Sequence, residues 1–394
     1  MWPRRLLIAL GVLLNLVGLI LLVWVLVAGP TTVARILRYG DTDIDDFSHY
    51  PGRRLSASRQ PSEFSRDQME IELPAIGIAG SGLEANELDQ LLAANDSIAF
   101  LAIKDGVIRH EAYFQGHSES SLSQLFSVSK SITSLLIGIA LDQGLMASVN
   151  EPVTRYVPEL GASGFDEVQL SHLLTMTSGT DYQENDNPFG EHVILNFTPD
   201  LERRLLSIGM ETEPGAVFRY KSGDNGLLAL ALTRALGDET ITEFAQGRLW
   251  GPLGMAHEAV WTIDSEQGGL EKTWCCLAVS APDLARIGQL FLNEGRWNDQ
   301  QIVSSHWVQA ASSPQVPEAI WPAEYMEAGW RNYGYQWWLA SEEDADIFAL
   351  GKDGQFLYIN PAHQVVIVRL GWSSGDLLSS QWIKLFQALA RTLE

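Results

Sequence analysis

The sequence predicts an α+β fold in which one sheet is built from both ends of the chain and the middle is mostly helical. Short β-rich runs separated by turn residues stand near both ends, within residues 98–114 and 355–370. Between about residues 120 and 313, apolar residues instead recur at helical spacing. We therefore expect an antiparallel sheet with flanking helices and a mostly helical subdomain.

The N-terminal residues 6–28 form an apolar stretch that is long enough to cross a membrane, at roughly 34 Å as a helix. Arg4 and Arg5 precede it, which favours a cytoplasmic N-terminus. A cleaved signal peptide and a buried core helix are the alternatives. The leading prediction is a membrane anchor over residues 1–29, at the inner membrane, with the rest of the chain on the periplasmic side.

The remaining elements follow in order along the chain. Residues 30–82 are polar and irregular, and we expect a tether that wraps the domain surface. Residues 83–115 and 333–394 are expected to form an α/β subdomain, and residues 116–332 the helical subdomain. The predicted strands are 98–103, 107–114, 355–359 and 365–370. The predicted helices are 83–95, 127–143, 169–176, 224–235, 281–293 and 376–393.

Composition excludes several classes of function. With 49 acidic and 26 basic residues the net charge is −23, which argues against a nucleic-acid partner because phosphate binding needs a basic face. The only cysteines, Cys275 and Cys276, are adjacent and too close for an ordinary disulfide, so we expect small buried apolar side chains. The pairs His110-Glu111 and His257-Glu258 lack the second histidine of a zinc-binding H-E-x-x-H motif, so no metal or cofactor is expected.

Two serine motifs compete for the role of nucleophile. Residues 371–375 read Gly-Trp-Ser-Ser-Gly, which fits the G-x-S-x-G elbow and stands between a predicted strand and a predicted helix. In an α/β-hydrolase, however, the catalytic histidine follows the serine, and no histidine follows position 363. We therefore favour a simple strand-to-helix turn at Ser373.

The second motif is S-x-x-K, formed by Ser127 and Lys130 at the start of a predicted helix. Residues three apart lie on one helix face, so the amine can reach the hydroxyl. Burial among apolar neighbours lowers the pKa of a lysine and makes the neutral amine available as a base. The helix N-terminus also supplies N–H groups for an oxyanion. The apolar neighbours are Phe126, Ile132, Leu135 and Leu136.

Two further motifs follow in the chain. Residues 220–222 read Tyr-Lys-Ser, and residues 352–354 read Lys-Asp-Gly before the last predicted hairpin. The order S-x-x-K, Tyr, K-x-G resembles the serine β-lactamase and penicillin-binding protein superfamily, over roughly residues 80–394. Other segments are similar to its esterase and 6-aminohexanoate-dimer (nylon-oligomer) hydrolase branch. These segments are residues 155–160, 172–179, 283–288, 334–338 and 351–355.

The resemblance implies a β-lactamase/transpeptidase-like fold and hydrolysis through an acyl-enzyme, without a cofactor. Ser127 would attack a carbonyl carbon, and Lys130 and Tyr220 would share the work of base and acid. The backbone N–H groups of Ser127 and Gln355 would form the oxyanion hole. We also expect neighbouring lysines to lower the pKa of Tyr220. The other substrate contacts that the resemblance implies are Tyr182, Ser222, Lys352, Asp353 and Gly354.

Two departures from the family pattern bear on the substrate. Tyr-Lys-Ser replaces the Tyr-x-Asn of β-lactamases, and Asp353 replaces the hydroxyl residue that helps to hold a substrate carboxylate. Our hypothesis is that neutral esters or amide oligomers fit better than penicillins or D-Ala-D-Ala peptides. A β-lactamase or D-Ala-D-Ala carboxypeptidase, and a penicillin-binding sensor without turnover, remain alternatives. The oligomeric state is left open.

The motifs also predict the character of the cleft. Three of the six lysines lie in or beside them, so we expect a small cationic site on an acidic protein. Most tryptophans are expected to be core contacts, and three of them are the best candidates for apolar lining of the cleft. The lysines are Lys130, Lys221 and Lys352, and the tryptophans are Trp330, Trp337 and Trp338.

Overall fold

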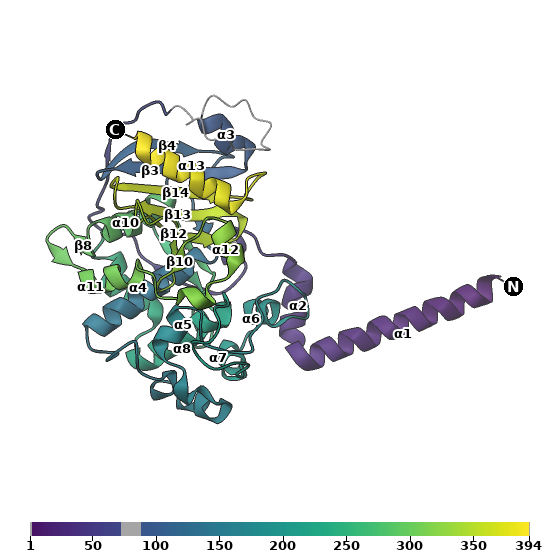
Figure 1. Cartoon of the computed structure of the whole chain (residues 1–394). Helices are drawn as coiled ribbons and strands as arrows, with labels where there is room; N and C mark the ends of the chain where they lie inside the picture. The colour runs from purple at the N-terminus through teal and green to yellow at the C-terminus, as the bar shows by residue number, and fades with distance from the viewer. Residues whose placement is uncertain (1, 72–87, 394) are drawn as a thin grey trace.

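The computed structural model describes residues 2–71 and 88–393. Its main feature is an eight-stranded sheet of order β10-β11-β12-β13-β14-β3-β4-β2. At its centre β3 (Ser97–Lys104) pairs antiparallel with β14 (Val365–Gly371), so strands from both ends of the chain meet in one sheet (Figure 1). The chain therefore has the expected α+β architecture.

The other strands of this sheet are short or lie toward its edges. One edge differs from the prediction, because β2 runs parallel to its neighbour β4 instead of antiparallel. The strands are β2 (Ser65–Arg66), β4 (Val107–Tyr113), β10 (Asn332–Tyr333), β11 (Trp338–Leu339), β12 (Ile347–Gly351) and β13 (Gln355–Asn360).

Both faces of the central strands are buried, which explains their continuous apolar sequences. Leu101 and Ile103 of β3 belong to one core, together with apolar residues of α4 (Val128–Asp142) and α10 (Ala281–Leu292). Phe100 and Ala102 point to the other core, with α13 (Ser379–Thr392). Helices therefore cover the sheet on both sides, and α4 packs in the core on one face (Figure 1).

The middle of the chain is helical, as predicted, but it also carries a second sheet that the sequence did not reveal. This four-stranded sheet has the order β1-β6-β7-β5. Its strands are β1 (Gly52–Leu55), β5 (Ser123–Gln124), β6 (Ala259–Thr262) and β7 (Leu277–Val279). The α-helices of this region are α5 (Leu170–Leu174), α6 (Glu191–Phe197), α7 (Leu201–Leu206), α8 (Ser222–Leu236), α9 (Ile241–Ala245), α11 (Ser305–Ala311) and α12 (Ala323–Glu327).

The N-terminal helix α1 (Trp2–Ala28) projects away from the rest of the molecule (Figure 1). Among the described residues, one helical segment has the length and composition of a membrane span, and it is Leu6–Ala28 of α1. Helix α2 (Pro30–Tyr39) follows directly and packs against α6. Beyond α2 the tether lies on the domain, since β1 joins β6 and β2 joins β4. Of the predicted helix 83–95, α3 (Leu88–Ala94) is seen, and residues 83–87 lie outside the described residues.

Candidate active site

Ser127 lies at the turn between β5 and α4, as the N-cap residue of the helix. The preceding residue, Phe126, has a positive φ of 47°, a left-handed conformation that costs about 1–3 kcal/mol in a residue other than glycine. The Ser127 hydroxyl makes no capping bond to the helix backbone. The turn therefore leaves this hydroxyl free to interact with other side chains.

Lys130 is placed against that hydroxyl. Its Nζ donates to Ser127 Oγ at 2.8 Å and to the backbone oxygen of Trp274 at 3.0 Å. The residue is 1% exposed, and burial lowers the pKa of the Lys130 amine to about 8. This is the direction that its apolar neighbours predict. Near neutral pH a useful fraction of the amine is therefore neutral while it already contacts the hydroxyl.

Tyr220 completes this group, and its hydroxyl is hydrogen-bonded to Ser127. The Nζ of Lys130 lies 4.9 Å from the centroid of the Tyr220 ring, which stacks on Trp338 at 5.4 Å between centroids. Burial raises the pKa of Tyr220, and the charge of Glu184 adds to this, although the bond to Ser127 lowers it.

The expected lowering of the Tyr220 pKa is therefore wrong. Burial outweighs the neighbouring cations, and one of those cations is not where the sequence suggests. The amine of Lys221 is buried and donates to the backbone oxygen and the hydroxyl of Thr180, away from Tyr220. Tyr220 thus stays protonated at neutral pH.

The third motif forms the turn between β12 and β13, beside the nucleophile. The end of β12 packs closely on the turn before Ser127, since a Cβ atom added to Gly351 would lie 2.3 Å from the backbone oxygen of Leu125. Within the turn Asp353 and Gly354 have φ values of 61° and 74°. Burial raises the pKa of the Asp353 carboxyl, and Lys352 partly opposes this effect.

A buried arginine that no sequence motif marks holds this turn in place. Arg369 of β14 donates to the backbone oxygens of Gly354 at 2.6 Å and Ser373 at 2.8 Å. A Cβ on Gly354 would lie only 2.0 Å from Arg369 Nη1, so the arginine fits only because residue 354 is glycine. The G-x-S-x-G segment is part of the same support, and the Ser373 hydroxyl donates to Asp96 at 2.6 Å.

The remaining predicted contacts lie at different depths. Tyr182 is buried, and its hydroxyl is 3.0 Å from Nδ1 of His192, which lines the cavity. Ser222 lines the cavity, but its N–H and its hydroxyl both donate to Glu184, each at 2.6 Å. Gln355 opens β13, and its side-chain amide donates to the backbone oxygen of Gly371 at 2.7 Å.

Ser127 opens into a cavity of about 660 Å³. Its charged lining is Asp41, Asp46, Glu184, Asp186, Lys272 and Lys352. Four acids thus face two lysines, and the expectation of a cationic cleft is wrong. Two causes are that Lys221 turns away and that the tether contributes two of the acids.

The three tryptophans that were candidates for the cleft lining are buried and do not line the cavity. Trp337 is fully buried, and Trp338 and Trp330 stack or tilt against each other and against neighbouring aromatic rings. The lining tryptophan is instead Trp274, the residue whose carbonyl receives the Lys130 amine. No sequence motif marks Trp274 or Lys272, because they reach the cavity only through the fold.

The cysteines also require a correction. Cys275 and Cys276 line the same cavity and are joined to each other by a disulfide, with their Cα atoms 3.7 Å apart. The prediction of two unpaired cysteines was based on the wider Cα spacing of ordinary disulfides. A disulfide between adjacent residues closes a ring within the backbone, so the Cα spacing of ordinary disulfides does not apply.

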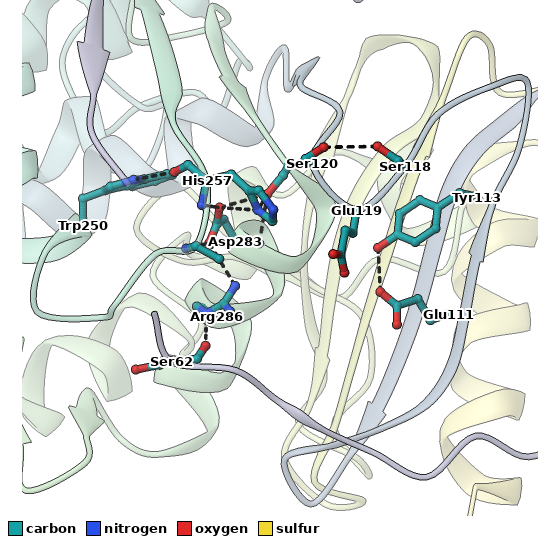
Figure 2. A network of polar contacts seen from close by, with 12 residues as sticks. Ser62, Glu111, Tyr113, Ser118, Glu119, Ser120, Trp250, His257, Asp283 and Arg286 are labelled. Atoms are coloured by element: carbon teal, nitrogen blue, oxygen red, sulfur yellow. Dashed lines mark hydrogen bonds and ion pairs between the residues drawn. The ribbon is translucent and has the colours of Figure 1, made fainter. Parts of the chain in front are cut away.

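A second polar network contains a serine, a histidine and an aspartate, but its contacts hold the fold together and do not form a catalytic triad (Figure 2). Asp283 accepts from the backbone N–H groups of Ala256 at 2.7 Å and His257 at 2.9 Å, and from Arg286 at 2.9 Å. Ser280 caps α10 and is fully buried. The network therefore joins α10 to the preceding loop and offers no accessible nucleophile.

Comparison with known proteins agrees with this geometry. The Beta-lactamase family matches residues 85–376, which include the S-x-x-K, tyrosine and Lys-Asp-Gly motifs. The chain belongs to the beta-lactamase family. It is thus a hydrolase.

Several relatives of this beta-lactamase family member are similar over most of its length. The 6-aminohexanoate-dimer hydrolase of Paenarthrobacter ureafaciens is 26% identical over 357 residues, which cover 86% of this chain and 90% of the relative. A Bacillus anthracis protein described as a candidate 6-aminohexanoate-dimer hydrolase has a TM-score of 0.75 at 23% identity, covering 87% and 91% of the two chains. A family VIII carboxylesterase has a TM-score of 0.58 at 14% identity, covering 77% and 96%.

Proposed function

We propose that the protein hydrolyses a carboxylic ester or amide through an acyl-enzyme on Ser127. The observation that carries this proposal is the 2.8 Å contact between Lys130 Nζ and Ser127 Oγ, made by an amine whose pKa burial lowers to about 8. A lysine with its usual pKa would be fully charged at neutral pH and unable to accept a proton. Here the base is both in contact with the nucleophile and partly neutral.

The reaction follows from these contacts. Neutral Lys130 accepts the Ser127 proton while Oγ attacks the carbonyl carbon, and the oxyanion forms near the N–H groups of Ser127 and Gln355. Tyr220, which is protonated and bonded to Ser127, gives its proton to the leaving alcohol or amine and regains one from Lys130. Water then attacks the acyl-enzyme with Lys130 as base, the bond between the acyl group and Ser127 Oγ breaks, and Lys130 returns the proton to Oγ as the acid is released.

We further propose that the preferred substrates are short neutral esters or amide oligomers. The four acids around the cavity and the carboxyl of Asp353 support this class, because they repel an anionic substrate. The sequence similarity to a 6-aminohexanoate-dimer hydrolase supports it as well. Rapid turnover of nitrocefin, above that of short esters, would instead favour the β-lactamase alternative.

For location, we propose a single-pass membrane protein whose hydrolase domain lies on the periplasmic side. The support is the apolar segment Leu6–Ala28, most of which is exposed, with Trp24 and Ala28 near its end buried against the domain. An apolar helix of this length is stable in a bilayer and costly to expose to water. A signal sequence would have the same composition, and the fractionation experiment argued below separates the two.

The decisive experiment replaces the nucleophile. We expect Ser127→Ala to lower p-nitrophenyl butyrate hydrolysis by about 1000-fold or more and to abolish labelling by a fluorophosphonate probe. Ser373→Ala is the matched control, since it removes the other candidate serine hydroxyl at a turn, and it should keep both signals. Activity that survives Ser127→Ala but is lost in Ser373→Ala would overturn the proposal. Labelling without turnover would instead indicate a sensor module.

A further inference from the structure

One wall of the active-site cavity comes from the tether, which precedes the family match that begins at residue 85. Gly40, Asp41 and Thr42 line the cavity together with Ser127. The segment is fixed beside the nucleophile, because Ile44 is fully buried and its backbone oxygen accepts from the N–H of Gln124 at 2.9 Å. The tether is therefore a built part of the site.

The tether contacts the lysine of the third motif directly. Lys352 Nζ donates to Asp41 Oδ1 at 2.8 Å, to the Thr42 backbone oxygen at 2.6 Å and to Thr42 Oγ1 at 3.3 Å. An ammonium group has three N–H donors, so these bonds match its full capacity. Asp353 Oδ2 lies 3.9 Å from the same Nζ atom. Lys352 thus has two carboxylates of its own chain within 4 Å.

We infer that Asp41 is a specificity-determining residue, which acts as a built-in counter-ion of Lys352 and excludes substrates whose acyl group ends in a carboxylate. A substrate carboxylate near Lys352 would have to displace Asp41 from the ammonium and would be repelled by it. A neutral acyl group meets no such barrier. The inference rests on the proposed hydrolysis at Ser127 and specifies which substrates that site accepts.

The position of Lys352 makes this effect relevant to the acyl group. Its Nζ lies 5.7 Å from the ring centroid of Phe126, the residue before the nucleophile, and both Lys352 and Ser127 line one cavity. The Asp41 side chain is 91% exposed, so its replacement leaves no buried group without a partner. Its bond to Lys352 lowers the pKa of Asp41, which keeps it charged at neutral pH.

The test uses the full-length chain in a nonionic detergent and two esters of equal acyl length. p-Nitrophenyl butyrate ends in a methyl group, and p-nitrophenyl hydrogen succinate ends in a carboxylate. We expect Asp41→Asn to raise kcat/KM for the succinate about fivefold relative to the butyrate. Asp45→Asn removes one charge from the same exposed tether without touching Lys352 and should leave the ratio unchanged. Ser127→Ala supplies the blank for spontaneous hydrolysis.

Salt gives an independent readout. At about 1 M NaCl, where charges are screened beyond about 3 Å, the difference between wild type and Asp41→Asn should shrink. If Asp41→Asn changes both esters equally, or matches Asp45→Asn, the inference is overturned while hydrolysis by Ser127 stands. If wild-type hydrolysis of both esters survives in Ser127→Ala, the proposed function itself fails. Asp41→Lys reverses the charge, and a shift no larger than that of Asp41→Asn would also count against the inference.

Discussion

Lys130 sets the pH dependence of the proposed reaction. Burial lowers the pKa of its amine to about 8, and only the neutral amine accepts the Ser127 proton. We therefore expect kcat/KM for p-nitrophenyl butyrate to rise about tenfold per pH unit below that pKa and to level off above it. A pH profile between about pH 6 and pH 10 measures this limb. Lys130→Arg keeps the charge but cannot deprotonate, so it should lose about 100-fold or more at every pH.

His192 is the alternative base, and its titration would give a different pH profile. His192 lines the same cavity, and burial lowers its pKa below the usual 6.5. An activity limb centred below pH 6.5 would therefore assign the titrating base to His192. Retention of that limb in Lys130→Arg, and its loss in His192→Gln, would contradict the role of Lys130.

At the scale of elements, the turn between β12 and β13 depends on the packing of Arg369 against Gly354. The chain offers a matched control, because Lys-Asp-Gly also forms the β3–β4 hairpin turn at residues 104–106. Gly106 and Gly354 have nearly equal φ values of 75° and 74°. A Cβ at Gly106 meets no atom within 4 Å, whereas at Gly354 it meets Arg369 Nη1 at 2.0 Å.

This contrast gives a prediction for two alanine variants. Gly106→Ala should cost about 1–2 kcal/mol of unfolding free energy, the usual penalty of a left-handed alanine, and keep full activity. Gly354→Ala carries the same penalty and also displaces Arg369, so it should cost about 1–3 kcal/mol more and strongly reduce ester hydrolysis. Urea unfolding and kcat/KM of both variants measure these effects. Equal losses in the two would show that Arg369 does not position the turn.

The helices, strands and loops also differ in how well the sequence predicts them. The contact between Ser127 and Lys130 was predictable, because a helix places residues three apart on the same face. The four strands that the two ends of the chain contribute to the sheet were predictable from local β-rich patterns. Trp274, Glu184 and Asp41 come from separate loops, and only the fold brings them to one cavity. The pKa of Tyr220 was misjudged for a related reason, since the sequence shows nearby charges but not the degree of burial.

At the scale of the whole molecule, the tether links a proposed membrane anchor to the active site. Helix α1 contacts the domain near its C-terminal end, where Trp24 meets Phe189 at 4.8 Å between ring centroids and the oxygen of Val27 accepts from Arg204 at 2.7 Å. Helix α2 then packs Val33 and Ile36 against α6. Only the short helix α2 thus separates the proposed membrane span from the cavity wall along the chain.

Two deletions separate anchoring from catalysis. Removal of residues 1–28 should release the protein from carbonate-washed membranes and leave kcat/KM for p-nitrophenyl butyrate unchanged, because α2 and the cavity wall stay in place. Removal of residues 1–46 also takes away buried Ile44 and the Asp41 contact, so it should cost at least about 2 kcal/mol of stability. It should also relax the discrimination against p-nitrophenyl hydrogen succinate. A natural chain that lacks residues 1–28 and is recovered in the soluble periplasmic fraction would show a cleaved signal, whereas an intact N-terminus in carbonate-washed membranes identifies α1 as the anchor.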